Sequence, residues 1–123
     1  MNLQDELQVI FDDMAIAYRS GDAAGCAAAF TEDALLTSPY APPAQGRSAI
    51  EALHVEWTSE GSGKKTLEVV DCGRSGDLAW CLVHYDEGEH TGRGTSLNIV
   101  EREAGGPWRI RMSSLNEIEP GQV

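Results

Sequence analysis

Apolar residues recur at helical spacing near the beginning of the chain. Between positions 3 and 18 they form one stripe, made of Leu3, Leu7, Ile10, Phe11, Met14 and Tyr18. This period predicts an amphipathic helix over residues 3–18. Gly21 suits the C-terminal cap of that helix, and Asp22 suits the N-cap of a short second helix built from small residues. A third helix is expected over about residues 47–59, with its apolar stripe on Ile50, Leu53 and Trp57.

The second half of the chain changes to strand-like patterns separated by glycine-containing turns. The predicted strands cover residues 65–72, 78–87, 93–103 and 107–116, after a first short strand at 34–37. Prolines in the segment 38–43 predict a loop that crosses an edge or an opening. The order of elements predicts an α+β fold, in which three N-terminal helices pack inside a strongly curved antiparallel sheet, a cone-shaped barrel.

Length and charge narrow the function classes. The 123 residues fit a single domain over residues 1–123, and no apolar run is long enough to span a bilayer. A net charge of −11 disfavours nucleic acid and membrane surfaces as partners. The acidic N-terminus and three cysteines without a paired spacing predict a cytoplasmic protein with reduced thiols.

A set of short motifs, in this order, carries a family resemblance. The motifs are Gly21-Asp22, Phe30-Thr31-Glu32-Asp33-Ala34, Pro39, Gly46-Arg47, Ile50, Gly76-Asp77-Leu78-Ala79 and Trp108-Arg109-Ile110. With them the chain resembles the nuclear transport factor 2-like superfamily, in particular its bacterial SnoaL-like and SgcJ/EcaC-like branches, whose fold is that of the ketosteroid isomerases. The resemblance implies a small-molecule cavity between sheet and helices, and a homodimer packed through the outer sheet face. It does not imply one chemistry.

The resemblance also identifies where catalytic groups stand in relatives. In the ketosteroid isomerases a tyrosine, an aspartate base and a protonated aspartate fall at the places of Met14, Ser38 and Asn98, and many relatives carry an aspartate at the place of Ser113. Methionine donates no hydrogen bond, serine is a weak base, and asparagine does not titrate. The usual ketosteroid isomerase mechanism is therefore not expected here.

Strand alternation assigns side chains to the two faces of the sheet. One face is predicted to carry Trp80, Leu82, His84, Ser96, Asn98, Arg111 and Ser113. The other is predicted to carry Ala79, Cys81, Val83, Leu97, Ile99, Trp108, Ile110 and Met112. The first, more polar face is assigned to the cavity and the second to a dimer interface. An error of one residue in register would exchange the two faces.

His84 is the leading candidate for a general base on this assignment, because its ordinary pKa lies near neutrality. It could instead be a histidine held by a neighbour at the rim of the sheet. Asn98 and Ser113 could hold a ligand carbonyl or bond each other across strands, and Arg111 could pair with a ligand carboxylate or with an acid of its own chain. Candidate apolar walls with a polar edge, or alternatively core and entrance residues, are Tyr18, Tyr40 and Trp57.

No metal or cofactor site is predicted. The run of residues 84–90 contains His84 and His90 among acids, but it matches no common zinc or calcium loop and is interpreted as a solvated turn. No phosphate-binding glycine loop is present. His54 is interpreted as a surface or interface residue.

Two hypotheses remain open at this point. The first is an isomerase, cyclase or dehydratase-type enzyme that acts on a small, partly apolar carbonyl compound. The second is a non-catalytic dimeric module that binds a small ligand or a protein.

Overall fold

The computed structural model describes residues 1–59, 64–87 and 92–118. Along the chain the elements are α1 (Leu3–Arg19), α2 (Ala23–Ala27), β1 (Phe30–Ser38), β2 (Ala41–Gln45), α3 (Arg47–Thr58), β3 (Thr66–Ser75), β4 (Leu78–Asp86), β5 (Arg93–Glu101) and β6 (Arg109–Ile118). The α+β class, the three helices and the four later strands are confirmed.

The N-terminal helices begin and end where local chemistry favours it. The Asn2 side chain accepts a hydrogen bond from the Asp5 backbone nitrogen at 2.9 Å and caps α1. Asp22 caps α2 in the same way, through the nitrogen of Gly25. Between the helices Gly21 adopts a φ of 73°, a left-handed conformation that glycine reaches without a steric penalty. Both predicted capping residues, Gly21 and Asp22, are thus confirmed.

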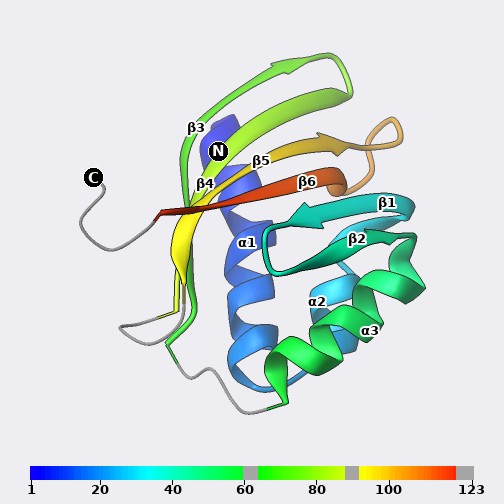
Figure 1. The fold of residues 1–123 in the computed structure, drawn as a ribbon. Coiled ribbons are helices and arrows are strands. Elements are labelled where there is room, and N and C mark those ends of the chain that lie inside the picture. The colour runs from blue at the N-terminus through cyan, green and yellow to red at the C-terminus, as the bar shows by residue number, and fades with distance from the viewer. Residues whose placement is uncertain (60–63, 88–91, 119–123) are drawn as a thin grey trace.

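All six strands form one curved sheet in the order β2-β1-β6-β5-β4-β3. Figure 1 shows the strands bending around α1, with α2 and α3 beside β1 and β2. The pairs are antiparallel except β1 with β6, which run parallel, so the prediction of an all-antiparallel sheet is wrong at this pair. The sheet does not close, because β2 and β3 lie at its two ends.

The proline-rich segment differs from its prediction. Strand β1 continues to Ser38, and the chain turns at Pro39 and Tyr40 into β2, which contains Pro42 and Pro43. Proline donates no backbone hydrogen bond, but β2 is an edge strand with a partner on one side only. A strand is therefore possible where a loop was expected.

Helix α1 protects the other edge of the sheet. Gln8 accepts a hydrogen bond from the nitrogen of Val69 at 2.8 Å and donates one to the carbonyl of Leu67 at 2.9 Å. Gln4 donates to the carbonyl of Val69 at 2.8 Å. These amides satisfy backbone groups of β3 that no further strand pairs with, and they hold α1 against the concave face.

Candidate functional site

A small inner chamber lies between the concave face of the sheet and the helices. Its volume is about 50 Å³. Most of its walls are apolar, formed by Phe11, Met14, Phe30, Leu36, Leu67, Ile110 and Leu115. Polar side chains also line it, among them His54, Ser96, Asn98 and Ser113. This mixture of apolar walls and few polar groups is typical of small-molecule sites.

A wider mouth of about 240 Å³ lies next to the inner chamber. The mouth is lined by Tyr18, Tyr40, Trp57, Lys65, Tyr85, Glu87, Gly92 and Leu115. Five of these residues line the inner chamber as well: Tyr18, Trp57, Lys65, Tyr85 and Leu115. These shared residues form the neck between the two spaces. Typical ligand pockets measure roughly 300–1,000 Å³, so the site suits a ligand of about one ring rather than a polycyclic one.

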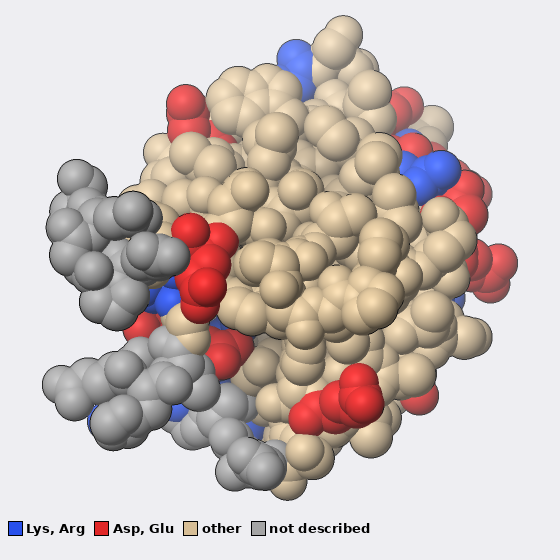
Figure 2. All heavy atoms as spheres, viewed as in Figure 1, with Lys and Arg blue, Asp and Glu red and all other residues tan. Residues whose placement is uncertain are grey.

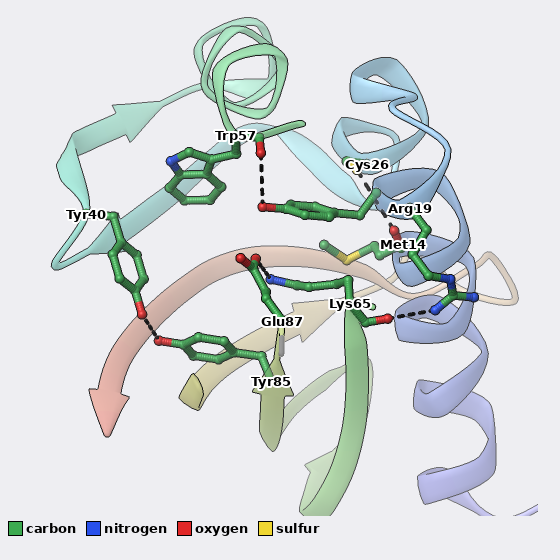
Figure 3. A network of polar contacts seen from close by, with 9 residues as sticks. Met14, Arg19, Cys26, Tyr40, Trp57, Lys65, Tyr85 and Glu87 are labelled. Atoms are coloured by element: carbon green, nitrogen blue, oxygen red, sulfur yellow. Dashed lines mark hydrogen bonds and ion pairs between the residues drawn. The ribbon is translucent and has the colours of Figure 1, made fainter. Parts of the chain in front are cut away.

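Lys65 occupies the centre of this neck. Its Nζ lies 2.7 Å from Oε1 of Glu87, and only 10% of the lysine side chain is exposed. The same nitrogen lies 4.4 Å from the centre of the Tyr18 ring and 5.2 Å from that of Tyr85. Figure 3 shows the Lys65 ammonium meeting the Glu87 carboxylate near the ring of Tyr85. Aromatic faces and a carboxylate stabilise a buried ammonium, and this ammonium is the one cation on the described cavity walls.

Tyrosine hydroxyls span the mouth. The hydroxyl of Tyr40, on the turn between β1 and β2, lies 2.7 Å from that of Tyr85 on β4. The Tyr40 ring also packs edge-to-face against Trp57 of α3. Burial raises the pKa of both tyrosines, so both hydroxyls keep their protons near neutrality. Tyr40 therefore lies at the entrance, the alternative that the sequence suggested for it.

His54 lies inside the chamber wall, so its interpretation as a surface residue is wrong. It is 4% exposed, and its ring packs against Tyr18, Phe30 and Trp57. Its Nδ1 lies 2.8 Å from the carbonyl oxygen of Ile50. A carbonyl only accepts, so Nδ1 carries the proton and Nε2 keeps a lone pair. Burial lowers the pKa of the imidazole, which the nearby Lys65 lowers further, so the ring is neutral near pH 7.

Three residues predicted to face the cavity from β4 point the other way. Trp80 and His84 are exposed and Leu82 is half-buried, on the convex outer face. Strand β4 is displaced by one residue from the predicted register: Asn98 pairs with Cys81 rather than with Leu82. Paired residues share a sheet face, so this displacement turns all three side chains outward. The inner face of β4 carries instead Ala79, Cys81, Val83 and Tyr85.

Strand β6 also differs from its predicted alternation. The register between β5 and β6 shifts after the pair of Ile99 and Met112, because Val100 pairs with Ile110. This bulge leaves Arg111 without an opposite residue and turns Ile110 inward, against its predicted outward position. Arg111 lies outside the lining of the chamber and the mouth, with its Nε 3.4 Å from Oδ2 of Asp33.

The remaining predicted site residues divide into two groups. The structure brings Met14, Tyr18, Trp57, Asn98 and Ser113 together in the inner chamber, and Asn98 pairs with Ser113 as predicted. Ser38 lies at the end of β1 and accepts a hydrogen bond from the Tyr40 nitrogen at 3.2 Å, away from the chamber lining.

Sequence reasoning missed His54, Lys65, Tyr85 and Glu87. Two of them carried a usable signal. His54 stands four residues after Ile50 and three before Trp57, on the apolar stripe of α3. Tyr85 continues the alternation of Cys81 and Val83 on β4. The pairing of Lys65 with Glu87 joins residues 22 positions apart and had no local signal.

Other site classes find no support in the described part of the chain. No group of three or more histidine, cysteine, aspartate or glutamate residues lies in metal-binding proximity there, and Gly88, Glu89 and His90 fall outside the described residues. All three cysteines are free, and burial raises the pKa of the Cys81 thiol to about 12. None of the described helices has the length and hydropathy needed to cross a membrane.

Comparison with solved structures supports the fold throughout. A ketosteroid isomerase-like protein from Erwinia carotovora atroseptica is 18% identical, with a TM-score of 0.79 over 98% of this chain and 100% of that one. A cystatin-like domain of unknown function from Nostoc punctiforme is 22% identical, with a TM-score of 0.78 over 98% of this chain and 82% of that one. A nuclear transport factor 2-like protein with a cystatin-like fold from Novosphingobium aromaticivorans is 19% identical, with a TM-score of 0.72 over 95% and 82%.

At the level of sequence, no curated protein matches the chain. The profile of the SnoaL-like domain, by contrast, matches residues 11–122. This range contains the capping residues Gly21 and Asp22 between α1 and α2, the whole sheet and every residue that lines the chamber. The chain belongs to the SnoaL-like domain family of the nuclear transport factor 2-like superfamily.

Proposed function

We propose that this protein binds a small, partly apolar carbonyl compound in its chamber and catalyses a proton transfer on it, as an isomerase, cyclase or dehydratase does. The observation that carries the proposal is His54, a neutral imidazole with a fixed Nδ1 proton in a largely apolar chamber. The described residues offer its Nε2 no hydrogen-bond partner. A general base needs such a lone pair next to the reacting proton. His54 thus takes the role that the sequence suggested for His84.

Lys65 supplies the complementary charge. A proton removed next to a carbonyl leaves negative charge on the carbonyl oxygen, and a cation in a site of low polarity stabilises that charge. The Lys65 ammonium lies in the neck between the chamber and the mouth. A ligand whose apolar body fills the chamber would place its carbonyl oxygen toward Lys65. His54 then accepts the proton, and Lys65 stabilises the enolate oxygen.

Deuterium exchange tests this proposal directly. The hydrogens next to the carbonyl of acetophenone are followed by proton NMR in deuterated buffer, with wild-type protein, the His54→Phe variant and the His84→Phe variant. Wild-type protein should accelerate exchange over buffer, and His54→Phe should lose about a hundredfold of that acceleration. His84→Phe makes the same substitution on the outer face and should exchange like wild type. An unchanged rate in His54→Phe would remove His54 as the base.

A non-catalytic binding module is the second candidate. One observation favours it: no carboxylate is found among the described residues that line the inner chamber, although relatives with known chemistry use carboxylates. Wild-type protein that binds acetophenone, as seen in a thermal shift, without accelerating exchange would favour this candidate over the enzyme.

We also infer a homodimer that packs through the outer sheet face. This face exposes Trp80, Leu97 and Met112 by 40%, 49% and 43%. Figure 2 shows a broad area free of charged side chains where strands β4 to β6 lie in front of α1. Exposed apolar patches of this kind often mark interfaces. Analytical ultracentrifugation should give twice the chain mass for wild type and one chain mass for Leu97→Glu; a wild-type monomer at all concentrations would contradict the dimer.

A cytoplasmic location is part of the same proposal. Its support is the presence of three free cysteines, since thiols stay reduced in that compartment.

A further inference from the structure

Asn98 places an amide at the most buried polar position of the chamber. It lies in the middle of β5, is 1% exposed, and lines the chamber together with Ser96 and Ser113. Its pairing partners across the sheet are Cys81 and Ser113. No titratable acid or base is among these neighbours apart from the Cys81 thiol, whose raised pKa keeps it protonated. The amide therefore acts only through its hydrogen bonds.

The orientation of this amide is determined by a backbone carbonyl. Its Nδ2 lies 3.2 Å from the carbonyl oxygen of Ser96 and 3.0 Å from the Ser96 Oγ. A carbonyl oxygen accepts but never donates, so the nitrogen of the amide has to be on that side. The opposite arrangement would bring two acceptors together. Oδ1 is then the opposite end of the amide, which these contacts leave unengaged.

Oδ1 of Asn98 has no hydrogen-bond partner among the described residues. A buried acceptor without a donor costs about 1–3 kcal/mol, and native proteins seldom keep one without a reason. Neither the Ser96 hydroxyl, which accepts from the amide nitrogen, nor the Ser113 hydroxyl is a partner of Oδ1, and most other chamber walls are apolar. What the chamber lacks at this point is a donor.

We propose that the ligand supplies this donor: it is a monocyclic hydroxy- or amino-carbonyl compound whose O–H or N–H donates to Asn98 Oδ1 at the inner end. Its carbonyl oxygen lies at the neck, where the Lys65 ammonium donates. The inference rests on the proposed function for the cavity and adds the class of ligand. It also assigns Asn98 the acceptor role, where the sequence had suggested that it holds a carbonyl.

The acceptor at Asn98 and the donor at Lys65 select among ligands by their hydrogen-bonding groups. A ligand that brings a hydroxyl to Oδ1 satisfies a group that is otherwise unpaired. An analogue that lacks the hydroxyl leaves the acceptor unpaired, and a methyl ether adds a second acceptor and extra bulk. Sites built around a substrate hydroxyl discriminate strongly against analogues without it, whereas apolar pockets discriminate weakly.

Three ligands that differ at one position test the inference in wild-type protein. They are 4-hydroxyacetophenone, acetophenone and 4-methoxyacetophenone, and their dissociation constants are measured by isothermal titration calorimetry. The hydroxy compound should bind about tenfold more tightly than acetophenone, and the methoxy compound more weakly than both. Equal affinities for the hydroxy compound and acetophenone would overturn the inference, leave the cavity function standing, and indicate that water satisfies Oδ1. If none of the three binds, the cavity function falls and the inference falls with it.

The variant Asn98→Leu assigns the preference to this residue. Leucine has a similar volume and no acceptor, so the tenfold preference for the hydroxy compound over acetophenone should disappear. Asn116→Leu is the matched control, because Asn116 is exposed on the neighbouring strand β6; it should keep the full preference. Loss of the preference in both variants, or in neither, would contradict the role of Asn98. Circular dichroism melting of each variant checks that it is folded, and the wild-type comparison above decides the inference even if Asn98→Leu does not fold.

Discussion

The two faces of strands β4 and β5 differ in composition although they belong to the same stretch of chain. The inner face carries small or buried residues such as Ala79 and Val83, together with the buried polar pair Ser96 and Asn98. The outer face exposes larger apolar side chains, among them Trp80 and Leu97. Hydrophobicity alone would assign the outer face to the interior. The prediction instead placed the more polar face inside, and it failed on β4 because the register was wrong by one residue.

The difference supports the proposal that the buried polar residues mark the ligand-binding side of this sheet. A buried amide and a buried imidazole are retained inside at a cost in stability, and such a cost is expected where a ligand binds. The larger apolar residues on the outer face are the basis of the proposed dimer interface. The two histidines differ in the same way: His54 lines the chamber, whereas His84 is exposed.

The largest expected effect compares one substitution on the two faces. Leu36→Ala, at a fully packed position of the inner face, should lower the free energy of unfolding by about 3 kcal/mol. Leu97→Ala, at a half-exposed position of the outer face, should lower it by less than about 1 kcal/mol. Urea unfolding at a low protein concentration measures both. Equal losses would mean that the two faces do not differ as described.

An intermediate effect compares ion pairs of different burial. Lys65→Met leaves the Glu87 carboxylate without its ammonium in the neck, and should cost about 2–3 kcal/mol. Arg111→Met removes the cation from the exposed Asp33, and should cost much less than the loss of the Lys65 ammonium. Chemical denaturation of the two variants gives the comparison. Addition of Glu87→Gln to Lys65→Met should recover part of the loss, and the absence of any recovery would contradict the assigned pairing.

The smallest effect concerns pH and separates the two histidines. Burial holds the pKa of His54 in the folded protein below its ordinary value of about 6.5. As the pH falls, the unfolded chain therefore binds a proton at this residue at a higher pH than the folded protein does. The stability associated with neutral His54 is fully present above pH about 6.5 and decreases below it. When the pH is lowered from 7.5 to 5.5, the melting temperature of wild type should fall more than that of His54→Phe. His84→Phe should behave like wild type, and a reversed order would contradict the burial of His54.

Much of the fold could be predicted from periodicity and capping. The apolar stripe of α1, the caps at Gly21 and Asp22 and the strand beginning at Leu78 depend on neighbours within a few positions. The parallel pairing of β1 with β6 could not be predicted in this way, because it joins residues 77 positions apart: Leu36 pairs with Ser113. The bulge at Arg111 was equally hidden, since one extra residue in a strand leaves no compositional mark.

The candidate site could be predicted only for elements whose pattern shows which face is buried. Met14, Tyr18 and Trp57 follow helical stripes whose apolar side must face the core, and all three line the chamber. Strand side chains had two possible faces, so one wrong register between β4 and β5 misplaced Trp80 and His84 together.

By itself the sequence determined the three helices, the four later strands, the family and the absence of acids at the inherited catalytic places, because each depends on local pattern or on residue identity; it did not reveal strand β2. Only the tertiary structure decided which sheet face is concave, that Lys65 meets Glu87 between two tyrosine rings, and that His54 rather than His84 lines the chamber. Those facts depend on register and on the curvature of the whole sheet, where a displacement of one residue reverses the direction of a side chain.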